Sequence, residues 1–193
     1  MTKRNRLIAL IDFSLYAHAI AEVGNRWCTI ADADLLLLHK VPGIVPGLSD
    51  GKTKSGIIDA EKEQARLKLV KLAEGKFPED VNVQFHVTER NLLLEISDLM
   101  KQGFNDYVIL GIKGTGMLKK ILMGSTATKI INELNAITVA VPNRLCVAPD
   151  KLCNLVPKHI VVTINDRYAL NEPAFNNFLD TFSGSIEEIR FMS

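Results

Sequence analysis

The sequence predicts an α/β protein with a doubly wound parallel sheet of five strands, in the order 3-2-1-4-5, with helices on both faces. Three observations predict this fold class. Apolar runs without polar alternation, typical of strands buried on both faces, recur along the chain. Segments with the apolar spacing of amphipathic helices separate these runs. Strands and helices therefore alternate, and right-handed crossovers then place helices on both faces of the sheet.

Five runs have the strand pattern. They are RLIALID (6–12), DLLLLHKV (34–41), VNVQFHV (81–87), DYVILG (106–111) and AITVAVP (136–142). Helices are predicted over residues 14–31, 57–74 and 90–102, and a further helix precedes the last strand. Residues 42–56, rich in proline and glycine, are predicted to form a mobile loop.

An incomplete second copy of the opening β-α-β unit is predicted at the C-terminal end. The strand HIVVTIN (159–165) aligns with the first strand, an apolar helix follows, and IEEIRFM then takes the place of the second strand. The predicted organisation is a first domain at 1–143, a linker at 144–157 and a partial repeat at 158–193.

The partial repeat is too short to bury enough apolar surface to fold alone. We therefore expect its helix to dock on the first domain or on a partner subunit through Phe175, Phe178, Leu179 and Phe182. Its first strand, around Val161 to Ile164, is expected to add to a sheet.

The composition is that of a globular protein, with 47% hydrophobic and 23% charged residues. A net charge of +1 disfavours a dedicated nucleic-acid-binding domain. The apolar run Leu7 to Ile11 is too short for a signal core, and no apolar run has membrane-spanning length. We expect a cytoplasmic protein with three reduced cysteines, no nucleic-acid partner and no membrane partner.

The stretch GIKGTGMLKKILMGST (111–126) has a spacing suited to phosphate binding: Gly111, two residues, Gly114, nine residues, then Gly124 and Ser125. Glycine lets a phosphate approach the backbone amides, and Ser125 with Thr126 would open a helix whose N-terminus attracts anions. The alternative is an ordinary strand-to-helix connection with turn glycines and an N-cap serine.

Asp12 is expected to face this stretch. It ends the first strand, and the predicted strand order reverses direction between the first and fourth strands. Open α/β sheets bind ligands in the crevice beyond such a reversal. The alternative is an aspartate that stabilises a turn or a helix N-terminus.

With its surroundings, VILGIKG…LKKILMGSTATKIINELNAITVAVP, this stretch resembles the universal stress protein family over about residues 5–143. ATP-binding members of that family carry Gly-x2-Gly-x9-Gly-(Ser/Thr) after the fourth strand. The resemblance implies that Asp12 and Val41 contact the adenine-ribose end of ATP. It implies that Gly111 and Gly114 hold the ribose and phosphates, and that Gly124, Ser125 and Thr126 bind the terminal phosphates. Lys113 stands where the family often has a basic residue.

The chain also departs from the family. HVTERNLLLEI lacks the Gly-x-Pro that is common before the third helix, so one wall of the site is not predicted. In the partial repeat Asn165 replaces the aspartate and the glycine motif is missing, so we do not expect that copy to bind nucleotide by itself. His39 and His86 are expected to be packed or hydrogen-bonded and not catalytic.

The predicted function is ATP binding, with Mg²⁺ sharing the phosphate charge and with little or no hydrolysis, in a sensing or regulatory module of the stress response. One alternative is a slow ATP-hydrolysing or nucleotide-transferring enzyme, although no general base is evident in the motif. Another is a nucleotide-free dimerisation module. We expect a homodimer that pairs through the edge strand 136–142, centred on Thr138 to Val141.

Overall fold

The computed structural model describes residues 3–43, 51–114, 121–122, 125–142, 157–163 and 170–192. The main sheet contains β1 (Asn5–Leu10), β2 (Ala33–Lys40), β3 (Val83–Thr88), β4 (Asn105–Gly114) and β6 (Ile137–Pro142). These strands are parallel and ordered β3-β2-β1-β4, with β6 on β4. The predicted fold class and strand order are confirmed, with β6 as the fifth parallel strand.

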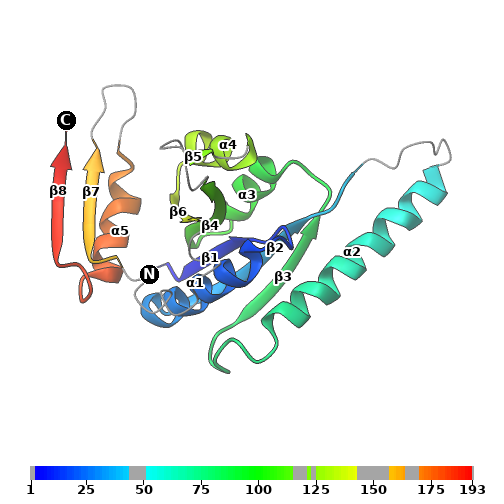
Figure 1. Ribbon diagram of the computed structural model, residues 1–193, viewed down its shortest axis with the longest axis horizontal. Coiled ribbons are helices and arrows are strands. Elements are labelled where there is room, and N and C mark those ends of the chain that lie inside the picture. Colours follow the sequence, from blue (N-terminus) through cyan, green and yellow to red (C-terminus); the bar gives the residue numbers. More distant parts are fainter. Residues whose placement is uncertain are drawn as a thin grey trace.

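Helices cover both faces of this sheet (Figure 1). One core cluster joins α1 (Tyr16–Ala31) and α2 (Gly51–Ala73) to side chains such as Leu35 and Leu37. The other joins α3 (Leu92–Met100) and α4 (Ser125–Glu133) to the alternate residues Leu36 and Leu38. Because successive strand residues point to opposite faces, a continuous leucine run serves both cores.

The prediction of a loop over residues 42–56 is wrong at its C-terminal end, because α2 already begins at Gly51. The first turns of α2 extend beyond the sheet, where they need no apolar stripe (Figure 1). Local polar contacts occur there instead, such as the Ser55 hydroxyl donating to the Asp59 carboxylate at 3.4 Å. Residues 44–50 lie outside the described residues.

The fourth strand does not end at Gly111 as predicted. β4 continues to Gly114, and its last two residues pair antiparallel with the two-residue strand β5 (Ile121–Leu122). Gly111 itself pairs with Val141 of β6. Residues 111–114 of the glycine-rich stretch are therefore strand and not loop. Glycine in a strand permits close packing from a neighbouring element.

The C-terminal residues form a separate β-α-β unit, with β7 (His159–Thr163), α5 (Glu172–Phe182) and β8 (Glu188–Met192). β7 and β8 pair in parallel with each other and do not join the main sheet. The predicted helix begins later than its apolar pattern, at Glu172, because the Asn171 carboxamide oxygen caps it by accepting from the N–H of Ala174 at 3.2 Å. The residues of the predicted linker up to 156 lie outside the described residues.

α5 packs on the first domain, against the face that α1 and β6 share. Phe178 and Phe182 are buried there among Trp27 and Tyr107. The ring centroids of Trp27 and Phe182 lie 4.5 Å apart, and those of Phe178 and Phe182 lie 5.0 Å apart. A polar contact adds to the aromatic ones, with the Asn177 amide donating to the Tyr107 hydroxyl at 2.6 Å. Of the four residues expected to dock, Phe178 and Phe182 are buried in this core and Leu179 packs against it, whereas Phe175 is not part of it.

Cys28 is part of the same apolar core. Burial, together with the nearby negative charge of Asp34, raises the pKa of the Cys28 thiol to about 12. The thiol is therefore neutral at physiological pH and packs as a small apolar side chain. Cys146 and Cys153 lie outside the described residues.

Candidate functional site

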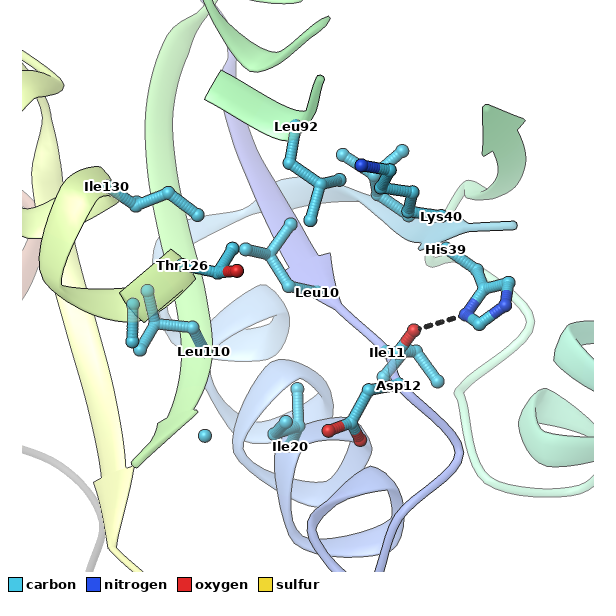
Figure 2. A pocket seen from close by; sticks show the side chains of 13 residues that line it. Leu10, Ile11, Asp12, Ile20, His39, Lys40, Leu92, Leu110, Thr126 and Ile130 are labelled. Atoms are coloured by element: carbon cyan, nitrogen blue, oxygen red, sulfur yellow. Dashed lines mark hydrogen bonds between the residues drawn. The ribbon is translucent and has the colours of Figure 1, made fainter. Parts of the chain in front are cut away.

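A cavity of about 320 Å³ opens at the carboxyl end of the main sheet (Figure 2). β1, β2 and β4 form its floor, and the first turns of α3 and α4 form part of its wall. It lies at the reversal of strand order between β1 and β4, where ligand sites of open α/β sheets are found. Three residues expected at the site line it, namely Asp12, Gly111 and Thr126.

Asp12 follows β1 and stabilises the turn into α1. Its carboxylate accepts a hydrogen bond from the N–H of Ser14 at 2.9 Å. Between them Phe13 has a φ of 57°, in the left-handed region that non-glycine residues seldom adopt. Asp12 therefore stabilises a turn, which was the alternative expected for it. Asp12 also remains exposed at the cavity, where its carboxylate can accept from a ligand.

Gly111 lies on β4 directly beneath the first residue of α1. A Cβ built on Gly111 would stand 2.9 Å from Cγ of Tyr16 and 3.0 Å from its Cβ. Real Cβ contacts are longer, so a side chain at position 111 would force the Tyr16 ring or the strand to move. Gly111 thus has a packing reason to be glycine that is independent of any ligand.

Ser125 and Thr126 begin α4, and both are exposed. Thr126 lines the main cavity, while Ser125 lines a smaller cavity of about 140 Å³ beside it. The backbone N–H groups of a first helical turn lack partners within the helix, so this end of α4 favours negative charge.

Among the remaining predicted residues, Val41 is the one whose surroundings the structure describes, and it is not among the residues that line the cavity. Val41 is buried, and its backbone N–H donates to the Thr88 carbonyl at 2.9 Å. Lys113 and Gly114 form the end of β4, but the surroundings of these two residues lie outside the described part of the structure. Gly124 lies outside the described residues altogether.

Sequence reasoning missed Lys40 and Leu92 as lining residues and assigned His39 no place at the site. Nδ1 of His39 lies 2.6 Å from the Ile11 carbonyl oxygen. The ring centroids of His39 and Phe13 lie 4.4 Å apart in a tilted arrangement, so His39 is packed and hydrogen-bonded, as was expected. Leu92 opens α3 and forms the wall where the family's Gly-x-Pro is missing. Lys40 could have been found from its place at the end of β2, the edge that also carries Asp12.

His86, the other histidine considered, is also hydrogen-bonded. Its Nε2 lies 2.8 Å from a carboxylate oxygen of the buried Glu95, whose other oxygen accepts from the Thr88 hydroxyl at 3.2 Å. This contact ties β3 to α3 and so helps to fix the helix that carries Leu92.

The cavity combines a carboxylate, the hydroxyl group of Thr126, a helix N-terminus and one lysine over an apolar floor, a set that can hold a polar ligand with an anionic part. Within the described ranges, no three His, Cys, Asp or Glu side chains come together as a group that could hold a metal ion. Nor does any helix of the described residues have the length and apolar content to cross a membrane.

Comparison with known proteins assigns the chain to a family. The sequence model of the universal stress protein family matches residues 3–142. This chain belongs to the universal stress protein family.

One relative is a universal stress protein of Mycolicibacterium smegmatis (strain ATCC 700084 / mc(2)155), 23% identical over 137 residues. The match covers 68% of this chain and 46% of the relative, so the chain spans about half of that protein's length.

Two solved structures of universal stress proteins from Archaeoglobus fulgidus share the fold. One is 16% identical, with 72% of this chain and 98% of that chain covered and a TM-score of 0.53. The other, from strain DSM 4304, is 14% identical, with 97% of this chain and 79% of that chain covered and a TM-score of 0.50.

Proposed function

We propose that the cavity at the carboxyl end of the sheet binds an adenine nucleotide, ATP with Mg²⁺, and that the protein is a nucleotide-dependent regulatory module of the stress response. The observation that carries the proposal is that Asp12, Gly111 and Thr126, far apart in the sequence, line one cavity at the reversal of strand order. Family membership supports the same proposal, since the glycine motif is that of ATP-binding members.

The polar groups suit the two ends of a nucleotide. Asp12 can accept hydrogen bonds from the nucleoside part, and the exposed start of α4 can receive phosphate oxygens at Ser125 and Thr126. We propose Mg²⁺ as the companion of the triphosphate because a divalent cation bound to the phosphate oxygens shares their negative charge. We propose slow or absent hydrolysis, because the motif offers groups that grip phosphate and no clear general base.

Calorimetry on nucleotide-stripped protein tests the proposal. We expect ATP with Mg²⁺ to bind, and Ser125→Ala to weaken binding by about 0.5–2 kcal/mol through loss of a hydrogen-bond partner. Ser183→Ala is the matched control, because its hydroxyl bonds the Asp180 carbonyl at the far end of α5. No heat and no rise in melting temperature at millimolar ATP would refute nucleotide binding. Rapid release of phosphate from ATP would favour the alternative that the protein is an ATP-hydrolysing enzyme.

The nucleotide-free dimerisation module remains the second candidate, and two observations favour it. Gly111 is explained by its contact with Tyr16, and Asp12 by its turn, without a ligand. Mass spectrometry of the purified protein separates the candidates, since retained nucleotide is expected only for the first.

We further propose a homodimer formed through the free edge of β6. In the described sheet β6 pairs with β4 alone, which leaves a row of backbone groups for another chain. Light scattering at micromolar concentration should give twice the chain mass, and Val139→Pro, which deletes a ladder donor, should give monomers. The melting temperature of the variant verifies that it folds. A monomeric parent protein would contradict this proposal.

The β7-α5-β8 unit is proposed to be a degenerate partial repeat of β1-α1-β2. Its element order and parallel pairing match those of the opening unit. It contributes Phe178 and Phe182 to the core of the first domain, and none of its described residues lines the cavity.

A further inference from the structure

A separate cavity, of about 260 Å³, lies where α5 meets the first domain. Residues at the start of β4 and of β6 form one side of it, and the first turns of α5 form the other. The main cavity opens at the carboxyl ends of the strands, so this one lies at the opposite edge of the sheet. Ligand sites are common at such junctions between structural units. We call this space the junction cavity.

Asp106, in β4, brings a buried carboxylate to the wall of the junction cavity. Its side chain is 1% exposed, and its Oδ1 accepts a hydrogen bond from Nε of Arg6 at 2.7 Å. Oδ2 is also buried, and no described residue donates a hydrogen bond to it. Burial raises the pKa of Asp106, although the Arg6 guanidinium acts in the opposite direction. One more donor would therefore stabilise the charged carboxylate.

The nearby donors of the protein are already engaged. In addition to its bond to the carboxylate, Arg6 donates from Nη1 to the Gln102 side chain at 2.7 Å and from Nη2 to the Leu99 carbonyl at 2.8 Å. The Asn177 amide, which lies in the cavity wall, donates to the Tyr107 hydroxyl at 2.6 Å. An acceptor is left over in the described wall, which favours a ligand that donates hydrogen bonds.

The start of α5 does not favour an anion. Oδ1 of Asn171 accepts from the N–H of Ala174 at 3.2 Å, and the Asn171 carbonyl accepts from the N–H of Phe175 at 2.9 Å. Pro173 has no N–H to offer. The groups of a first helical turn that could hold an anion are thus used within the helix. A divalent metal ion does not suit the site either, because Asp106 is the only carboxylate among the described lining residues.

The junction cavity also has an apolar part. Six lining residues are apolar, namely Met100, Phe104, Ala136, Ile137, Pro173 and Ala174. A short hydrocarbon chain can lie against these side chains while a charged end reaches Asp106. Lys3 is exposed at the same cavity, so its positive charge opposes the binding of a cation.

We propose that the junction cavity binds a small organic ammonium ion. The ammonium group donates to Oδ2 of Asp106 in a charge-assisted hydrogen bond, and the hydrocarbon part lies against the apolar residues. The bound ion contacts both the first domain and α5, so it stabilises the docking of the C-terminal unit. This site is independent of the nucleotide proposal, because it lies at the other edge of the sheet.

A protein-observed NMR titration with n-butylammonium chloride tests the proposal, and 1-butanol is the neutral probe of the same shape. We expect saturable shifts at the amides of residues 105–107, 135–137 and 174–177, with a dissociation constant in the millimolar range because the probe is small. 1-Butanol should bind at least about fivefold more weakly, since it lacks the charge. Equal binding of the two probes, or no saturable shift with n-butylammonium, would overturn the proposal.

Two substitutions separate the effect of charge from that of space. Lys3→Gln removes a like charge and should tighten n-butylammonium binding about two- to fivefold, the size expected for one exposed charge. Lys71→Gln, at an exposed position of α2 away from this cavity, is the control. Ala174→Leu fills the cavity and should weaken binding at least about tenfold, whereas Asn176→Leu, at an exposed position of α5, should not. Unchanged Trp27 emission verifies that α5 remains docked.

The variants can also contradict the proposal. Weaker n-butylammonium binding in Lys3→Gln would show that the site prefers an anion. Equal effects of the two leucine substitutions would show that the ion does not occupy the junction cavity. Neither result bears on nucleotide binding at the main cavity.

Discussion

Replacing Phe182 by alanine should detach the C-terminal β-α-β unit and lower the free energy of unfolding by about 3–5 kcal/mol. Phe182 is 1% exposed and is the most buried side chain of α5. It contacts Trp27 at 4.5 Å and stands perpendicular to Tyr107 at 6.3 Å. Removing the ring leaves a cavity where α5 meets the first domain, at the most buried of the unit's apolar contacts, and the short unit cannot bury enough apolar surface by itself to compensate.

The single tryptophan reports this contact directly. Trp27 is buried against Phe182 and Phe178, so loss of docking should move its fluorescence to longer wavelength as water reaches the indole. Urea unfolding followed by Trp27 emission gives the stability change. Phe191→Ala is the control, because Phe191 is 63% exposed on β8, and its loss should change stability by less than about 1 kcal/mol.

Equal effects of the two substitutions would contradict the docking of α5. So would an unchanged Trp27 spectrum in Phe182→Ala, since the indole would then not depend on the helix. Fast hydrogen exchange across 172–192 in Phe182→Ala, with the parent protein protected, would show that this contact holds the unit in place.

The main sheet could be predicted because burial on both faces leaves a distinct trace in the sequence. Leu35 to Leu38 form an unbroken apolar run, and alternate members face the two cores. Predictions failed where structure does not depend on burial. The first turns of α2 are polar in sequence, and β4 continues beyond Gly111 because it pairs with β6 and β5, segments that follow later in the sequence.

The residues of the candidate site likewise fall into two groups, those that a local sequence pattern predicts and those that only the fold brings together. Asp12, Gly111 and Thr126 were predicted from a strand end and from glycine spacing, both of which are local patterns, and they line one cavity. Lys40 stands at a strand end, as Asp12 does, and could have been included on that ground, whereas the place of Leu92 follows from how α3 meets the sheet in space. The contact of Val41 with a nucleotide was expected by resemblance alone and stays a prediction; in the structure its N–H donates to the Thr88 carbonyl.

Gly111→Ala should destabilise the protein without any ligand, by about 1–3 kcal/mol, as expected for overpacking. The added Cβ would lie 2.9 Å from Cγ and 3.0 Å from Cδ1 of Tyr16, atoms near the root of the side chain that a rotamer change of the ring end cannot clear. Gly56→Ala is the matched control. It has no atom within 4 Å of its added Cβ and lies within α2, so alanine should stabilise by about 0.5–1 kcal/mol.

A double-mutant cycle with Tyr16→Ala assigns the cause. If the Tyr16 ring is what excludes a side chain at Gly111, the two substitutions together should cost less than the sum of their separate costs, by about 1 kcal/mol or more. Additive costs would show that the ring is not the cause, and would leave the Tyr16 Cβ, which alanine keeps, or the strand itself as the reason for glycine. No destabilisation in Gly111→Ala would remove the packing explanation, and the reason for glycine would then lie with a ligand that approaches the backbone at this position.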